Sequence, residues 1–372
     1  MVGASGPRAW REKAVPSLFS CRSAPNRPPQ PLLPSSLDRM KPPFVIAGRL
    51  RREYLLPPQG QPLLDSPGGN LLYAAGGLAV WENDVGLLGR VGEDYPQQWL
   101  SRFEQYGLDT RGIRILPQPL DLRFFLAYTE DYRPSYTNPV GHFARRSLTF
   151  PKSLLGYQAP TERTDNRAPS PDSPRVADIP DDYLHAKAVH LCPLDFITHH
   201  HLLLAFHQKT SPAVTLDPSP GYMQPNFLSD LRLLLDGLAA FLPSEEELRS
   251  LFWGQTNDLW EMMEALGEYG CPVIVVKRGG RGQWLYDATG KRRWEIPAYP
   301  ARMADPTGAG DAFCGGFLAG LHRTGDPLQA ALYGNVTASL KCEGSGPFYP
   351  LDVLGGLAQA RLEALQGLVH PA

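Results

Sequence analysis

Short apolar runs alternate with amphipathic stretches along most of the chain, above all from residue 183 onward. The clearest run is Pro-Val-Ile-Val-Val-Lys at residues 272–277, and its unbroken apolar character is typical of a buried parallel strand. Because such runs alternate with helical segments over short connections, they predict an α/β fold with a parallel sheet and helices on both faces. Ligands of such sheets bind beyond the carboxyl ends of the strands.

The same patterns predict an ordered set of elements. Strands are expected at residues 44–48, 85–92, 122–128, 188–191, 213–217, 237–242 and 272–277. Helices are expected at residues 71–81, 94–106, 199–208, 226–236, 244–252 and 259–269.

Two proline-rich segments lack any hydrophobic period. Residues 1–40 hold seven prolines and six Lys or Arg, and we interpret them as a disordered N-terminal extension. An organellar transit peptide is the weaker alternative, because proline disfavours the amphipathic helix that it requires. Residues 151–180 predict a long surface loop, with simple loop decoration favoured over a regulatory role. Together, residues 1–70 and 151–180 hold half of the 38 prolines.

Composition narrows the function classes. The 372 residues include 36 Lys or Arg and 38 Asp or Glu, and this net charge of −2 argues against a nucleic-acid or membrane surface as partner. No apolar run approaches the ~20 residues of a membrane span. The five cysteines are scattered without a CxxC pair, which favours free thiols in a reducing, cytoplasmic setting.

The most specific chemistry lies at residues 305–311, Asp-Pro-Thr-Gly-Ala-Gly-Asp, which lead into a helix of small residues. Glycines let the backbone approach a ligand closely, and the N–H groups at a helix start attract a phosphate. The carboxylate of Asp311 would repel that phosphate, so its presence makes sense if it accepts a proton from an attacking hydroxyl. A role for Asp311 as a mere acidic helix cap is the weaker interpretation, because Asp305 already precedes the turn. No Walker A pattern occurs.

Residues 305–318 match the C-terminal signature of the PfkB-type carbohydrate kinases, and the chain resembles this ribokinase-like family over roughly residues 44–350. The resemblance implies a ribokinase-like three-layer sandwich over residues 41–372, with a mostly parallel sheet and a small β lid. Lid material is expected at about residues 49–62 and 121–147. The resemblance also implies that Asp311 is the catalytic base. The backbone of Gly308, Ala309 and Gly310 would then form the anion hole.

Other landmarks of the family occur in the same order along this chain. They imply ATP as co-substrate and Mg²⁺ bound through water to Glu247, with a monovalent cation such as K⁺ near Asp305 and Thr307 as a further possibility. The nucleotide-binding residues implied in this way are Lys277, Gly279, Gly282 and Asn335.

The acceptor side departs from the family pattern. Gly68 and Gly69 match its substrate-side signature, but Tyr73 stands where sugar kinases usually have Asn, and Glu53 where they have Asp. We still assign these four residues to substrate binding. On the phosphate side, Ser244 replaces the Asn of the family's Asn-x-x-Glu segment.

The favoured function is an ATP- and Mg²⁺-dependent kinase that phosphorylates a hydroxyl of a small molecule, with a sugar as the favoured acceptor. A nucleoside kinase is one alternative, in which Tyr73 and lid aromatics would stack a base. A non-catalytic ligand-binding relative is another. A homodimer is possible.

Some conspicuous residues have plain interpretations. The run His199, His200 and His201 predicts a solvated helix start rather than a metal cluster. Glu245 and Glu246 predict an acidic first helical turn. A set of aromatics fits substrate stacking and sheet packing about equally: Phe124, Phe125, Tyr128, Tyr132 and Tyr136.

Overall fold

The computed structural model describes residues 41–129, 131–159 and 166–371. The predicted extension at residues 1–40 and residues 160–165 of the predicted proline-rich loop lie outside the described part of the chain.

Within the described residues, ten strands form the larger sheet in the order β14-β13-β12-β11-β10-β9-β8-β1-β4-β5. Neighbouring strands are parallel from β11 to β5 and antiparallel from β14 to β11. Their bounds are β1 (Phe44–Ala47), β4 (Val85–Gly92), β5 (Leu108–Leu116), β8 (Ala188–Leu191), β9 (Ala213–Leu216), β10 (Ala240–Phe241), β11 (Val273–Lys277), β12 (Gln283–Asp287), β13 (Arg292–Ile296) and β14 (His370–Pro371).

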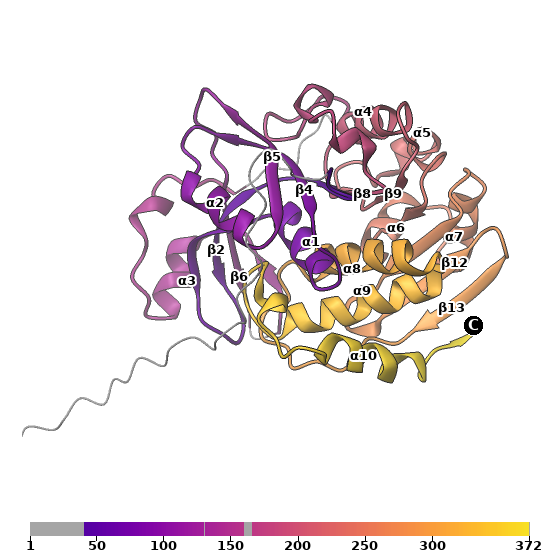
Figure 1. Ribbon diagram of the computed structural model, residues 1–372. Helices are drawn as coiled ribbons and strands as arrows, with labels where there is room; N and C mark the ends of the chain where they lie inside the picture. The colour runs from indigo at the N-terminus through magenta and orange to yellow at the C-terminus, as the bar shows by residue number, and fades with distance from the viewer. Residues whose placement is uncertain (1–40, 130, 160–165, 372) are drawn as a thin grey trace, which may run out of the picture. The chain divides into compact units, whose positions relative to one another are not determined.

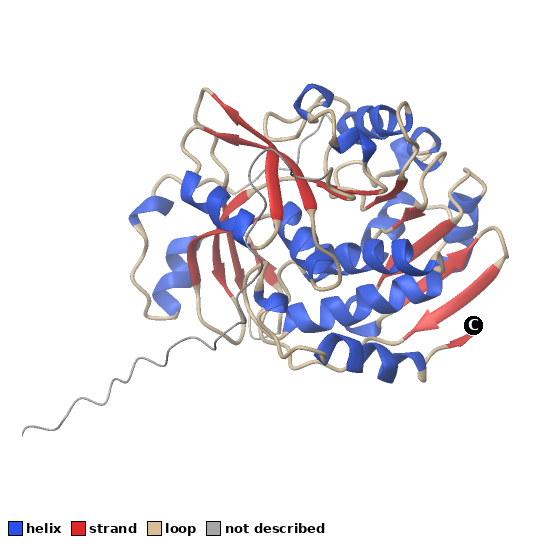
Figure 2. Ribbon diagram, viewed as in Figure 1, coloured by secondary structure: helices blue, strands red, loops and turns tan. Residues whose placement is uncertain are grey.

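Helices cover both faces of this sheet (Figures 1 and 2). One face carries α1 (Asn70–Ala79), α2 (Gln97–Gln105), α8 (Ala309–Thr324), α9 (Pro327–Cys342) and α10 (Leu357–Gln366). The other carries α4 (Phe196–His207), α5 (Arg232–Leu235), α6 (Glu245–Leu251) and α7 (Leu259–Gly267). Short 3-10 turns occur at Lys152–Leu154, Val176–Asp178, Tyr183–His185, Pro225–Phe227, Gly279–Arg281 and Tyr349–Leu351.

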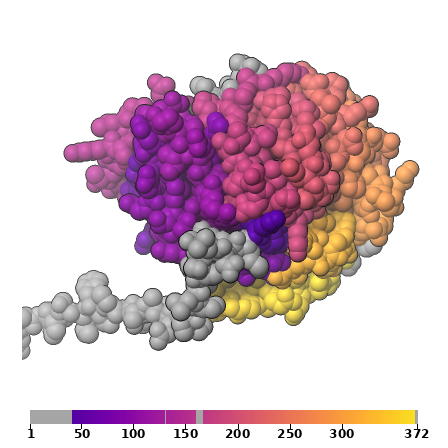
Figure 3. Space-filling view, turned by 45° about the horizontal axis from the view of Figure 1, so that its top comes forward, coloured from indigo at the N-terminus to yellow at the C-terminus, as the bar shows by residue number. Residues whose placement is uncertain are grey.

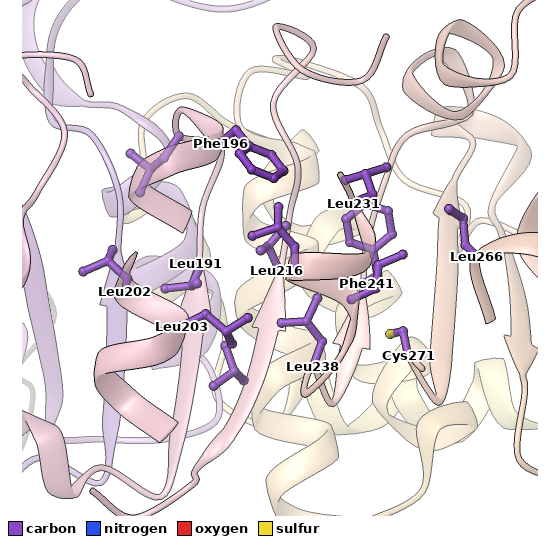
Figure 4. Packing of buried hydrophobic residues seen from close by; sticks show 14 of the residues in the cluster. Leu191, Phe196, Leu202, Leu203, Leu216, Leu231, Leu238, Phe241, Leu266 and Cys271 are labelled. Carbon is purple, nitrogen blue, oxygen red and sulfur yellow. The ribbon is translucent and has the colours of Figure 1, made fainter. Parts of the chain in front are cut away.

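Alternation along β1 divides the core between the two faces. Val45 and Ala47 pack in the cluster under α4 to α7, whereas Phe44 and Ile46 pack under α1, α2 and α8. This division follows from the period of two in a strand, and it explains why the predicted strands are apolar without a break. Figure 4 shows the first cluster, in which Leu191 and Leu216 of the sheet approach Leu203 of α4.

A second, four-stranded sheet has the order β3-β2-β6-β7. Its strands are β2 (Arg51–Leu56), β3 (Leu63–Gly68), β6 (Arg123–Tyr128) and β7 (Pro134–Ser135), and α3 (Pro139–Arg145) packs on it through Phe143. The sheet uses residues from both segments expected to form a lid, together with β3, which begins just beyond the expected boundary at residue 62. Its action as a lid stays a prediction.

The predicted α/β class, with a mostly parallel sheet covered on both faces, is confirmed. Strands expected at residues 85–92 and 188–191 are observed with those bounds. The strand expected at 237–242 is shorter, because Gly237 lies in a turn with φ 96°. The prediction of one helix over residues 226–236 was wrong in extent. A 3-10 turn at Pro225–Phe227 and the short helix α5 (Arg232–Leu235) occupy this segment. Figure 3 shows purple and pink segments side by side on one face of the surface.

The described part of the predicted proline-rich loop is not only a surface decoration. Ser173 is fully buried, and its hydroxyl donates to Oδ2 of Asp195 at 2.7 Å. The adjacent Asp172 accepts from the Arg51 guanidinium at 2.7 Å. The segment is a loop, as predicted from its prolines, but part of it is buried, because it supplies hydrogen-bond partners to the N-cap of α4 at Asp195 and to Arg51 of β2.

Four of the five cysteines lie in the described residues, where each is buried and unpaired, as predicted. No helix among the described residues is both long enough and apolar enough to cross a bilayer.

Helices α1 and α8 cross at very short range. A β-carbon on Gly315 of α8 would lie 2.0 Å from the carbonyl oxygen of Ala74 in α1, and one on Gly77 would lie 2.3 Å from that of Ala312. Both obstructing atoms belong to backbone, which cannot rotate away. Glycine at these two positions is therefore what allows the helices to touch.

We expect Gly315→Ala to destabilise the protein. The gain in helix propensity is about 1 kcal/mol, but overpacking against backbone costs about 1–3 kcal/mol or more. Urea unfolding followed by circular dichroism measures the net effect. Gly355→Ala is the matched control, because no atom lies within 4 Å of the added β-carbon. Equal unfolding midpoints for the two variants would contradict the argument.

Candidate active site

The turn before α8 has the backbone that its glycines predicted. Gly308 caps the helix in the left-handed region at φ 71°, and a β-carbon there would lie 2.2 Å from the ring of Tyr73. The Ala309 N–H donates to the Pro306 carbonyl at 3.1 Å, whereas Gly310 is exposed. The start of α8 is thus a tight turn that faces solvent at Gly310.

Asp311 lies in the first turn of α8 and is half-buried. Burial, with a further contribution from the carboxylate of Asp217, raises the pKa of Asp311 to about 7, while Lys277 acts in the opposite direction. A carboxylate with a pKa near neutrality is well suited to accept a proton during a reaction.

A buried ion pair lies beside this turn. Nζ of Lys277, at the end of β11, donates to Oδ2 of Asp217 at 2.5 Å, and Asp217 follows β9 directly. A β-carbon on Gly310 would lie only 3.7 Å from Nζ, so the ammonium faces the start of α8. Burial alone would lower the pKa of Lys277, but nearby acidic groups, chiefly Asp217, raise it above its ordinary value. Lys277 therefore stays a cation beside the start of α8.

Glu247 is held by the residue that replaces the family's Asn. Its Oε2 accepts from the backbone N–H and from the hydroxyl of Ser244, both at 2.8 Å, and Ser244 in turn caps α6. Burial, and then the carboxylate of Asp217, raise the pKa of Glu247 to about 7. Ser244 thus keeps Glu247 in place despite the substitution.

A cavity of about 580 Å³ opens next to the ion pair and the turn. Its lining includes Lys277, Gly279, Pro306, Ala309, Gly310, Tyr299, Phe313 and Asn335. The side chain of Asn335 is already committed: it donates to Gln283 and the Pro297 carbonyl and accepts from Tyr299 N–H. It therefore shapes the wall of the cavity. Gly282 is absent from the lining and serves the adjacent turn at φ 85°.

The four residues expected to bind substrate form one cluster at the start of α1. Glu53 reaches Gly68 and Gly69, and its Oε1 accepts from the Gly69 N–H at 2.8 Å. Its Oε2 accepts from the Tyr73 hydroxyl, also at 2.8 Å. Glu53 and Tyr73 are each only 2% exposed. The two departures from the family pattern are therefore direct partners of one another.

The small sheet touches the turn before α8. The Tyr128 hydroxyl of β6 lies 3.2 Å from Oγ1 of Thr307, within hydrogen-bond distance. The Thr307 N–H donates to Oδ1 of the fully buried Asp305 at 2.9 Å, while Oδ2 of Asp305 has no partner. Among the aromatics of this sheet, Phe125 belongs to its core, whereas Phe124 and Tyr136 form a pair at its margin.

Of the two plain interpretations of the sequence, the one for His199 was wrong and the acidic first turn at Glu245 and Glu246 is confirmed. His199 is fully buried rather than solvated: it donates to the Cys192 carbonyl and accepts from the Tyr222 hydroxyl, both at 2.8 Å. Glu245 does lie in the first turn of α6, but its side chain is buried between Arg249 and Arg278. In both cases the polar side chain can be buried because partners from other elements, Tyr222 for His199 and Arg278 for Glu245, satisfy its hydrogen bonds.

Sequence reasoning missed two charged residues of this region. Asp217 ends a predicted strand, and the rule that ligands gather at the carboxyl edge could have indicated it. Lys341 is the only charged residue among the small and apolar residues 336–342, which was the available signal for a buried cation.

Comparisons with known proteins bear on this geometry. Residues 181–353 match the pfkB family of carbohydrate kinases. The matched segment covers 173 of the 372 residues and includes the turn before α8 with Asp311. A cytidine kinase from Thermococcus kodakarensis is 28% identical to it over 288 residues, which make up 77% of this chain and 90% of that protein.

Two solved structures show the same fold as this chain. A protein from E. coli provisionally designated ribokinase II, in complex with ATP and Mg²⁺, has a TM-score of 0.64 at 18% identity and covers 86% of this chain and 98% of its own. A fructokinase from Vibrio cholerae with bound fructose, ADP and potassium ion has a TM-score of 0.61 at 18% identity. The match covers 88% of this chain and 99% of the fructokinase. The predicted ribokinase-like sandwich is thereby confirmed.

We expect Glu53→Gln to reduce the pH dependence of stability. Burial raises the pKa of Glu53 from 4.5 to about 7, although hydrogen bonds from Gly69 and Tyr73 oppose the shift. Because the folded state then holds a proton that the unfolded state releases, stability falls as the pH rises from about 4.5 to about 7. Gln can accept from Gly69 and donate to Tyr73, so it fits the same place without titrating.

The measurement is the free energy of unfolding in urea at pH 5.5 and pH 8. The wild type should lose on the order of 2–3 kcal/mol more between these values than Glu53→Gln does. Parallel pH curves for the two proteins would contradict a raised pKa at Glu53.

Proposed function

We propose that this protein is a pfkB-type kinase that transfers the γ-phosphate of ATP to a hydroxyl of a small sugar or nucleoside, with Asp311 as the base. The observation that carries the proposal is the position of Asp311 beside the exposed turn at Gly310, which also lines the cavity that Lys277 borders. Proton acceptor, phosphate site and nucleotide-sized cavity thus meet at one place.

Each residue has a distinct task in this proposal. The Asp311 carboxylate takes the proton of the acceptor hydroxyl as that oxygen bonds to phosphorus. The start of α8 and the Lys277 ammonium balance the negative charge on the transferring group. Asp217 holds Lys277 in position through their short ion pair.

Magnesium fits this site as a companion of the nucleotide. Within the described residues, no group of three His, Cys, Asp or Glu side chains is arranged to hold a metal. Mg²⁺ usually keeps several waters and binds through substrate phosphates with one or two carboxylates. Glu247, with its raised pKa and one carboxylate oxygen outside the Ser244 contacts, suits that outer role. When bound, the ion would neutralise phosphate charge.

The proposed phosphate acceptor is a sugar hydroxyl, either of a free sugar or of the sugar within a nucleoside. The similarity to a cytidine kinase over nine-tenths of that protein favours a nucleoside as the second candidate. Tyr73 is not free to stack a base, since the Gly308 turn lies against its ring and its hydroxyl binds Glu53. A base would instead meet Phe124 and Tyr136. ATP consumption across a panel of sugars and nucleosides separates the two classes.

We expect Asp311→Asn to lower kcat by on the order of 10²–10⁴, because the amide cannot accept the proton. The measurement is ATP-dependent phosphorylation of the best acceptor in the panel. Asp352→Asn, on an exposed turn, is the matched control. Circular dichroism and thermal unfolding establish that both variants fold. Near-normal turnover of the folded Asp311→Asn variant would contradict the proposal that Asp311 is the base.

The pH profile provides a second test of Asp311. Since only the deprotonated carboxylate can accept a proton, kcat/KM should rise with pH through a midpoint of about 7, the pKa of Asp311 in the free protein. Glu53 and Glu247 have similar pKa values, so the same rise with pH must persist in both Glu53→Gln and Glu247→Gln, even if the overall activity falls. A midpoint near pH 4 would mean that Asp311 titrates normally or is not the base.

A further inference from the structure

Lys341 lies in the last turn of α9 and is fully buried. Lysine is almost never fully buried without partners, because removing an ammonium from water is costly. The proton transfer proposed above makes no use of this residue. Its buried charge therefore calls for a different explanation.

The ammonium is bound by backbone oxygens from two separate loops. Nζ donates to the carbonyl of Gly344 at 2.8 Å and to that of Asp305 at 3.2 Å. It also lies 5.5 Å from the ring centroid of Tyr73. The turn is tied to the same helix end a second time, since the N–H groups of Ala304 and Asp305 both donate to the Cys342 carbonyl.

This arrangement bears on the monovalent cation expected near Asp305 and Thr307. Such an ion would need carbonyl oxygens in place of its water shell. The carbonyls of Asp305 and Gly344 are already occupied by the ammonium, which carries the same single positive charge. The fructokinase of known structure holds a potassium ion, but the residues of this chain do not fit an additional one at these oxygens.

We propose that the Lys341 ammonium takes the place of a monovalent cation behind the phosphate-binding turn, so that the kinase needs no potassium. The inference rests on the proposed function. Lys341 acts here as a positioning residue: it fixes the carbonyl of Asp305, and through it the turn that ends at Gly308. Because the ammonium is part of the chain, no ion must be captured from solution.

Three salts of equal ionic strength test the wild type: KCl, NaCl and tetramethylammonium chloride. Because tetramethylammonium is too large for a site of this kind, it serves as the salt without a usable cation. We expect kcat/KM to agree within about twofold in all three, a change well under 1 kcal/mol in barrier height. Severalfold activation by KCl would overturn the inference.

Two substitutions separate charge from packing. Lys341→Ser removes the ammonium and leaves space, so activity should fall by on the order of tenfold or more in tetramethylammonium chloride and recover in KCl. Lys341→Met removes the charge but fills the space, so KCl should not restore the activity of this variant. Lys209→Met, at an exposed surface lysine, is the control. Equal losses in Lys341→Ser with and without KCl would contradict a role as cation.

A readout other than activity keeps the test decisive. The thermal midpoint of Lys341→Ser should rise when KCl replaces tetramethylammonium chloride, whereas that of the wild type should not change. A KCl-induced rise in the wild type as well would refute the inference. If the wild type phosphorylates no acceptor in any salt, the proposed function fails, and the thermal shifts alone decide whether Lys341 replaces the ion.

Discussion

The site depends on the contact between α1 and α8. Both helices begin at the carboxyl edge of the parallel sheet, and the glycines at 77 and 315 let their backbones touch. This contact sets the ring of Tyr73 against the turn at Gly308, so the Glu53–Tyr73 cluster and the turn before α8 lie directly against each other. A wider crossing would separate the two clusters while leaving each intact.

Three acidic side chains and two lysines lie around this crossing. Asp311, Glu247 and Glu53 are each raised to a pKa of about 7, because burial and neighbouring carboxylates oppose their ionisation. Lys277 and Lys341 are the buried cations beside them. A metal-bound nucleotide would change both the charge and the hydration around these acids. Its binding and the protonation of the three acids are therefore linked.

The sequence predicted local features far better than partnerships. Apolar runs such as residues 188–191 predicted the buried strands, and the turn at Gly308 followed from its glycines, because both depend on neighbouring residues. The Lys277–Asp217 pair joins positions 60 residues apart, and nothing near either residue indicates the other. The same holds for the link of Lys341 to the Asp305 turn. The hairpin of β12 and β13 was missed because charged residues break up its apolar pattern.

The hydrogen bond between Tyr128 and Thr307 has a mechanical consequence. Tyr128 belongs to the small sheet, whereas Thr307 belongs to the turn that starts α8, and the two meet over the buried Asp305. Any swing of the small sheet away from the body must break this bond and release one anchor of the turn. Movement of the small sheet and the rigidity of the turn before α8 are therefore coupled through this hydrogen bond.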